Sequence, residues 1–188
     1  MKSRKLIAGV DEVGRGSLVG AVFSAAVIFK PDTYIKNLKD SKKISPKNRL
    51  KLSNNIIIHS LCVSIGVASK DEIDEMNIHH ATLLSMKRAV DNLSIQPHKI
   101  YFDGLYVPDL KIESHAIVRG DSEIREISAA SIIAKVARDN EMIYLHNKFE
   151  IYKFIKNKGY GTREHLDAIS YLGTVSYTHL TLPTILRV

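Results

Sequence analysis

The sequence has little of what several protein classes require. A single cysteine, Cys62, among 188 residues excludes an internal disulfide framework and a zinc site made of several thiolates. No apolar run approaches the roughly 20 residues that cross a bilayer. The basic first residues reach Asp11 too soon for a secretory signal. We therefore expect a cytoplasmic protein with no membrane partner.

Positive charge is concentrated in the first third of the chain. The formal net charge is +7 at pH 7. Residues 1–60 hold 12 Lys and Arg against 4 Asp and Glu, whereas residues 61–188 hold 15 against 16. Clustered positive charge is typical of proteins that bind a polyanion. On charge alone, a solvated basic face is the alternative.

Residues 7–16 are the most informative stretch. An apolar run rich in Ile and Val predicts a buried strand, which ends on two adjacent carboxylates, Asp11 and Glu12. A desolvated carboxylate needs a counter-charge, and a hard cation such as Mg²⁺ or Mn²⁺ supplies one. In the following Gly14-Arg15-Gly16, the glycines let backbone N–H groups approach a ligand, and arginine suits a phosphate. For this stretch alone, a solvated strand end followed by a turn is the alternative.

The rest of the chain alternates predicted strands and helices. Further strands are expected over residues 20–29 and 61–68, within the stretch 97–104 with its end at Asp103, and over residues 115–119. Helices are expected over residues 46 to about 59, from residue 70 onward, and over about 122–145. The first two strands should form a hairpin. One face of the strand at 61–68 holds only small residues, which admits a closely packed helix. This order predicts an α/β fold, with a mixed β-sheet flanked by helices.

Two more carboxylates follow predicted strands. Asp103 ends one short strand, and Asp121 follows another, where capping of the next helix is its alternative role. The ends of neighbouring strands can converge in a mixed sheet although they are distant in sequence. Asp11, Glu12, Asp103 and Asp121 are therefore candidates for one site. Phosphodiester hydrolysis by two cations needs such a carboxylate cluster.

Residues 147–158 mix lysines with aromatic residues. This mixture suits nucleic acid, because rings stack on bases and lysines neutralise phosphates. A small amphipathic helix that packs on the main domain explains the pattern equally well. A turn at 159–162 and a short helix that ends at Gly173 follow.

Six segments together resemble ribonuclease HII, a branch of the ribonuclease H-like nucleases. They are Gly9-Val-Asp-Glu-Val-Gly-Arg-Gly16, Asp40-Ser-Lys-Lys-Ile-Ser45, Phe102-Asp-Gly104, Gly120-Asp121, Ile127-Ser-Ala-Ala-Ser-Ile-Ile-Ala-Lys-Val-Ala-Arg-Asp139 and Gly159-Tyr-Gly-Thr-Arg-Glu-His165. Their order and spacing cover about residues 5–173. The resemblance implies a ribonuclease H-like catalytic domain at 1–145 and a small helical appendage at 146–173 that contacts the substrate.

The resemblance also implies an activity. Such an enzyme hydrolyses the RNA strand of RNA/DNA hybrids and cuts 5′ of single ribonucleotides embedded in duplex DNA, leaving 3′-hydroxyl and 5′-phosphate ends. Two Mg²⁺ or Mn²⁺ ions would be held by the four carboxylates named above. The implied substrate-binding residues are Gly14, Arg15 and Gly16 at the 2′-hydroxyl, Tyr160 on a sugar, and Lys42 and Lys43 at phosphates. The expected partners are RNA/DNA hybrid and ribonucleotide-containing duplex DNA, bound by a monomer.

Residues 174–188 depart from the family pattern, because they carry almost no charge. They resemble translated adaptor sequence, and we expect a non-family tail there that replaces the natural end. Two other functions are therefore kept open. One is a nucleic-acid-binding protein whose catalysis is impaired because the native C-terminus is missing. The other is a different metal-dependent nuclease or phosphatase of similar architecture. The presence of all four carboxylates favours the ribonuclease.

Overall fold

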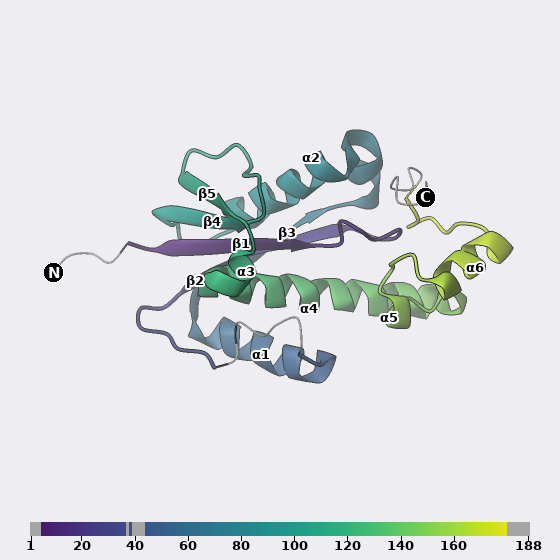
Figure 1. The fold of residues 1–188 in the computed structure, drawn as a ribbon, viewed down its shortest axis with the longest axis horizontal. Helices are drawn as coiled ribbons and strands as arrows, with labels where there is room; N and C mark the ends of the chain where they lie inside the picture. The colour runs from purple at the N-terminus through teal and green to yellow at the C-terminus, as the bar shows by residue number, and fades with distance from the viewer. Residues whose placement is uncertain (1–4, 37, 39–43, 180–188) are drawn as a thin grey trace.

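A five-stranded sheet forms the centre of the molecule (Figure 1). The computed structural model describes residues 5–36, 38 and 44–179. The strands are β1 (Ile7–Val13), β2 (Val22–Phe29), β3 (Ser60–Ala68), β4 (Lys99–Asp103) and β5 (Glu113–Ile117). The helices are α1 (Pro46–His59), α2 (Lys70–Asp91), α3 (Gly120–Glu123), α4 (Arg125–Lys148), α5 (Phe154–Asn157) and α6 (Arg163–Leu172), and η2 (Glu150–Tyr152) is a 3-10 turn.

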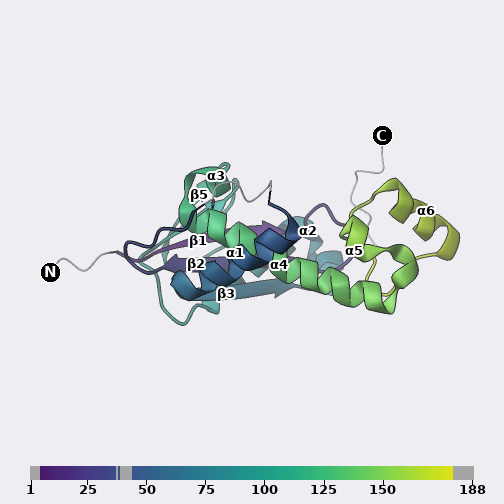
Figure 2. The same ribbon diagram turned by 90° about the horizontal axis from the view of Figure 1, so that it is seen from below.

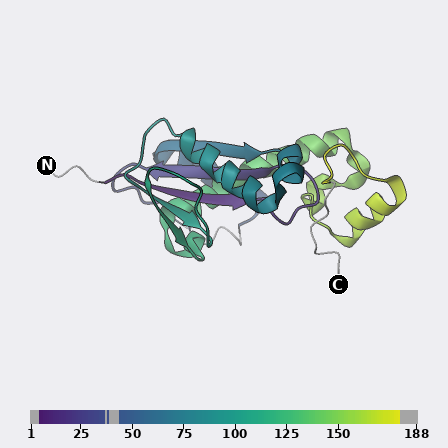
Figure 3. The ribbon, with the colours of Figure 1, turned by 90° about the horizontal axis from the view of Figure 1, so that it is seen from above.

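The sheet is mixed, with β1 at its centre. Its strand order is β3-β2-β1-β4-β5. β1 runs antiparallel to β2 and parallel to β4, which confirms the predicted hairpin and the predicted α/β class. α2 covers one face of the sheet (Figure 3), and α4 covers the other together with α1 (Figure 2). The middle of β1, residues 8–11, is thus buried, whereas Glu12 and Val13 at its end are only partly buried.

Two glycines set the distance between the helices and the sheet. The small face of β3 packs under α2, as predicted, and a Cβ at Gly66 would lie 2.0 Å from the carbonyl oxygen of Ser85. On the other face, a Cβ at Gly9 would lie 2.2 Å from the backbone nitrogen of Ile127 in α4. No side chain fits in either place, so both helices lie directly on the strands.

One helix and one strand depart from prediction. The helix expected over 122–145 is divided into α3 and α4 by Ile124, which has extended φ and ψ of −107° and 118°. Asp121 lies inside α3, and the cap residue of α3 is Arg119, so the interpretation of Asp121 as a helix cap is wrong. The strand expected at 115–119 lies two residues earlier, because Ile117 pairs with Asp103 and Arg119 already turns with a φ of 58°.

The segment after α4 forms a small satellite at the end of that helix (Figures 1 and 2). Tyr152 and Phe154 are buried in its core, where their rings stack with centroids 5.6 Å apart. Exposed Lys153 and Lys156 both pair with Glu164 on α6. The packing alternative is therefore correct for these two rings, which face inward and offer no surface for bases.

The described part of the predicted tail, residues 174–179, packs on the same satellite. Tyr177 accepts a hydrogen bond from the backbone N–H of Gly20 at 3.0 Å, and the N–H of His179 donates to Leu18 at 3.0 Å. The sequence pattern offers no sign of this pairing. Within the described residues, no helix is both long and apolar enough to traverse a lipid bilayer.

A Gly66→Ala substitution tests the contact between α2 and β3. The added methyl group would collide with backbone atoms that cannot rotate away, so we expect the free energy of unfolding to fall by about 1–3 kcal/mol. Urea denaturation measures this change. Gly16→Ala is the matched control, because a Cβ there meets only ordinary contact at 3.7 Å. Equal stability of the two variants would contradict the close approach.

Candidate active site

The central strands bring three of the four predicted carboxylates to one end of the sheet, where β1 and β4 end. Asp11 and Glu12 lie near the end of β1, and β4 runs parallel beside it and ends on Asp103. α3 adds the fourth, because the backbone N–H of Asp121 donates to Oδ1 of Asp103 at 3.4 Å. Residues that are far apart in sequence therefore lie together where the chain leaves β1 and β4.

The carboxyl group of Asp11 is buried, and its pKa is raised. Its side chain is 5% exposed, and burial raises its pKa from 3.8 to about 7, with the nearby charges of Glu12 and Asp103 adding to the rise. A hydrogen bond from Ser131 and the charge of Lys135 lower the pKa without cancelling the rise. Negative charge at the end of β1 is thus only partly compensated by the protein.

Glu12 shares this environment. Burial raises the pKa of its carboxyl group above 4.5, while Arg15 opposes the rise from 3.5 Å away. Arg15 is half exposed, so its charge is screened by water and compensates poorly. A small groove joins both residues to Asp103 and to the edge-on ring pair of His79 and Tyr106.

The chemistry of these donors fits a hard divalent cation. Every donor is a carboxylate oxygen, which is the ligand type that Mg²⁺ and Mn²⁺ prefer. A cation would also supply the positive charge that Asp11 and Glu12 lack. Across residues 5–36, 38 and 44–179, no three His, Cys, Asp or Glu side chains are arranged as a ready-made ligand set. The carboxylates are thus neighbours along one edge and do not converge on a single point.

The predicted substrate-binding residues fall into two groups. Gly14, with a φ of 111°, opens the glycine loop (residues 14–20) that joins β1 to β2. Ser17 in this loop pairs with Tyr160 in an isolated bridge, and a Cβ at Gly16 would lie 3.7 Å from the Tyr160 ring. Tyr160 is 41% exposed. Lys42 and Lys43 lie outside the described residues.

Sequence reasoning missed the residues of α4 that support this region. Ser131 and Lys135 act on Asp11, and Arg138 contacts the glycine loop. All three lie within the segment 127–139 that carries the family resemblance. The available signal was their spacing of four and three residues, which places them on one helix face among small side chains.

The sheet order, the helices on both faces and the carboxylates beside the central strand define a nuclease fold of the ribonuclease H-like class. The profile of the "Ribonuclease HII" family matches residues 8–188, a span that includes the segment predicted to be a non-family tail. A curated ribonuclease HII from Pseudoalteromonas atlantica is 55% identical over 172 residues, which cover 92% of this chain and 87% of that protein.

Solved structures agree with this assignment. The ribonuclease H2 from Pyrococcus horikoshii OT3 superposes with a TM-score of 0.82 at 25% identity, covering 97% of this chain and 96% of that one. Bst-RNase HIII in complex with Mn²⁺ has a TM-score of 0.68 at 17% identity, covering 89% and 70%, and shares the fold. The chain belongs to the ribonuclease HII family, and it is a metal-dependent endoribonuclease.

Asp11→Asn should stabilise the metal-free protein. Between pH 3.8 and about 7, the folded state binds more protons at Asp11 than the unfolded chain does, so this group lowers stability as pH rises through that window. Above pH 8 in EDTA, we expect the variant to gain roughly 2–4 kcal/mol, with little gain at pH 4.

Urea denaturation at both pH values measures the gain. Asp109→Asn is the matched control, because Asp109 is exposed and its replacement should change stability by less than about 0.5 kcal/mol. A variant at Asp11 that is no more stable than wild type at high pH would show that the buried charge is compensated.

Proposed function

We propose that this enzyme hydrolyses the RNA strand of RNA/DNA hybrids and cuts duplex DNA on the 5′ side of single embedded ribonucleotides. The products carry 3′-hydroxyl and 5′-phosphate ends. The main support is the group of carboxylates at the ends of β1 and β4, whose negative charge the protein only partly compensates. This group lies directly before the glycine loop in a chain of this family. The enzyme acts as a cytoplasmic monomer, with a catalytic domain at 1–145 and a substrate-contacting appendage at 146–173.

Four residues hold the metal in this proposal: Asp11, Glu12, Asp103 and Asp121. Bound by these residues, two Mg²⁺ or Mn²⁺ ions would supply activation of water and stabilisation of the leaving oxygen. The Mn²⁺ present with Bst-RNase HIII, which has the same fold, supports this choice of ions. The protein's own contribution is orientation: β1 and β4 are rigid, buried elements, and they fix the acids better than loops would.

The glycine loop and Tyr160 recognise the ribonucleotide. Gly14, Arg15 and Gly16 sense the 2′-hydroxyl, the group that distinguishes RNA from DNA. Tyr160 places its exposed ring on the neighbouring sugar. The excess of positive charge in residues 1–60, which includes Lys42 and Lys43, attracts the phosphate backbone.

A cleavage assay tests the function. The substrate is a labelled duplex with one ribonucleotide, offered with Mg²⁺, Mn²⁺ or EDTA, beside an all-DNA control. We expect one metal-dependent cut on the 5′ side of the ribonucleotide and none in the control. Asp11→Asn should lower the rate by at least about a thousandfold, as loss of a metal ligand does, while the variant still binds the duplex. Binding without cleavage by the wild type would instead support the binding-only alternative.

Arg15→Ala tests the recognition role separately. Arg15 is half exposed and has one acidic neighbour, so the free energy of unfolding should change by less than about 1 kcal/mol. Loss of one charge-assisted hydrogen bond should lower kcat/KM on the single-ribonucleotide duplex by about tenfold. An unaltered kcat/KM on that substrate would remove Arg15 from the proposed site.

A further inference from the structure

We propose that Arg138 is a positioning residue for ribonucleotide recognition. Its buried guanidinium joins the glycine loop to the Tyr160 turn (residues 157–160), so that these two segments meet the substrate as one unit. This inference rests on the proposed function, in which both segments contact the ribonucleotide and its neighbouring sugar. Arg138 acts through them, because only 3% of its side chain is exposed.

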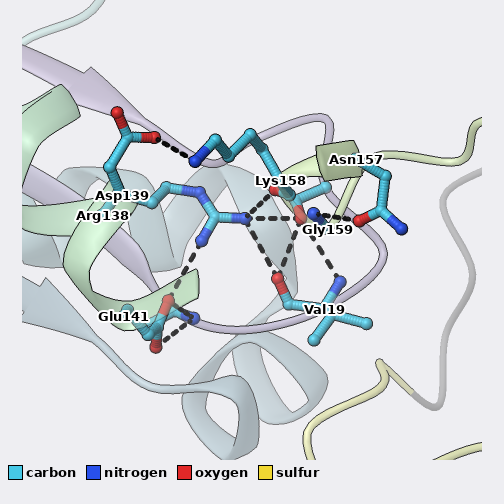
Figure 4. Close-up of polar contacts among 9 residues, drawn as sticks. Val19, Arg138, Asp139, Glu141, Asn157, Lys158 and Gly159 are labelled. Atoms are coloured by element: carbon cyan, nitrogen blue, oxygen red, sulfur yellow. Dashed lines mark hydrogen bonds and ion pairs between the residues drawn. The ribbon is translucent and has the colours of Figure 1, made fainter. Parts of the chain in front are cut away.

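One nitrogen of Arg138 connects the two segments. Nη2 donates to Oγ of Ser17 at 2.5 Å and to the carbonyl oxygen of Val19 at 3.1 Å, both in the glycine loop. The same nitrogen lies 3.3 Å from the carbonyl oxygen of Lys158, which it also reaches as a donor (Figure 4). Three acceptors from two separate segments therefore share one donor group at the middle of α4.

The other side of the guanidinium fixes its orientation. Nη1 donates to Oε2 of Glu141 at 3.0 Å. The carboxylate of Glu141 in turn accepts from the backbone N–H of Ala21, where the loop enters β2. The charge of Arg138 is thus paired, and its planar fork is held at both ends. An ammonium group has no such fixed geometry.

The surrounding glycines show how closely the backbone approaches. A Cβ at Gly159, whose φ is 79°, would lie 2.6 Å from Oγ of Ser17 and 3.2 Å from Nη2 of Arg138. A Cβ at Gly14, whose φ is 111°, would lie 3.1 Å from Nε of Arg138. Leu18 also donates its N–H to the carbonyl oxygen of Gly159 at 2.9 Å. Both segments therefore pack around the guanidinium at the limit that backbone atoms allow.

This arrangement predicts a particular defect when Arg138 is changed. A single ribonucleotide in DNA offers one register in which the loop and Tyr160 contact their targets together. A continuous RNA/DNA hybrid offers a ribonucleotide in every register. Loosening the link between the two segments should therefore slow cleavage of the single-ribonucleotide duplex more than cleavage of the continuous hybrid. A displacement of about 1 Å is enough to lower a rate by a large factor.

The test measures kcat/KM on both substrates. The quantity compared is the ratio of kcat/KM on the single-ribonucleotide duplex to kcat/KM on the continuous RNA/DNA hybrid. Arg138→Lys keeps the charge and loses the fork, and we expect it to lower the ratio by at least about tenfold. Ser17→Ala removes one of the three acceptors and should lower the ratio about threefold. In a double-mutant cycle with Tyr160→Ala, the effects of the Arg138 and Tyr160 changes on the ratio should be non-additive, since both act on one contact.

Arg88→Lys is the matched control. Arg88 also donates to a carboxylate, that of Glu72, and to a carbonyl, that of Val67, but it lies on α2 away from the loop. Its replacement should reduce stability and leave the ratio unchanged. If the role of Arg138 were purely structural, Arg138→Lys would also leave the ratio unchanged, because cleavage of both substrates would slow by the same factor.

The outcomes separate this inference from the proposed function. Wild-type enzyme that cleaves neither substrate with metal overturns the function and this inference with it. Wild-type enzyme that cleaves both, with a ratio that stays within about twofold in Arg138→Lys and Ser17→Ala, overturns the positioning role alone. Where Arg138→Lys yields no folded protein, the ratio of Ser17→Ala decides.

Discussion

The desolvation of Asp11 is the constraint on which the rest of the structure depends. Asp11 lies on the central strand, between β2 and β4, and the close packing of α4 over Gly9 removes water from that strand. Burial raises its pKa to about 7, and the hydrogen bond from Ser131 and the charge of Lys135 offset only part of this rise. A fold selected for stability alone would place an apolar residue there. A buried carboxylate that lowers stability in this way is the kind of residue expected at a functional site, which agrees with its proposed role as a cation ligand.

A single helix, α4, connects that charge to the glycine loop. One face of α4 presents Ser131 and Lys135 to Asp11, and Arg138 one turn later to the glycine loop. Because the spacing of these residues is helical, their relative positions are fixed by α4 itself. The carboxylates at the ends of β1 and β4 and the segments proposed to read the ribonucleotide therefore both contact α4. The proposed metal ligands and the glycine loop are therefore aligned by α4 as well as by the contact between Glu12 and Arg15.

Local patterns predicted most of the fold, and long-range contacts account for the rest. The hairpin and the tight packing under α2 followed from strand alternation and small residues, and the sheet order agrees with the predicted class. The break at Ile124 was missed, and the inward packing of Phe154 was only one of two alternatives, because its partners in the core, such as Leu18 and Val19, are distant in sequence. The break at Asn77 was also missed, although its contacts are local: its φ of 69° divides α2, and its side chain accepts from the backbone N–H groups of His79 and His80. Asp11, Glu12 and Asp103 were found because they lie at or near strand ends, and Asp121 because it follows a predicted strand, whereas Arg138 carries no such local mark.

The most direct test of the buried, under-compensated charge is a titration of Asp11 in the metal-free protein. Carboxyl ¹³C NMR of aspartate-labelled enzyme, with the Asp11→Asn variant used for assignment, reports its protonation without relying on activity. The account predicts a midpoint near pH 7, well above the ordinary 3.8. A midpoint near the ordinary value would show that the protein already neutralises Asp11, and it would contradict the account.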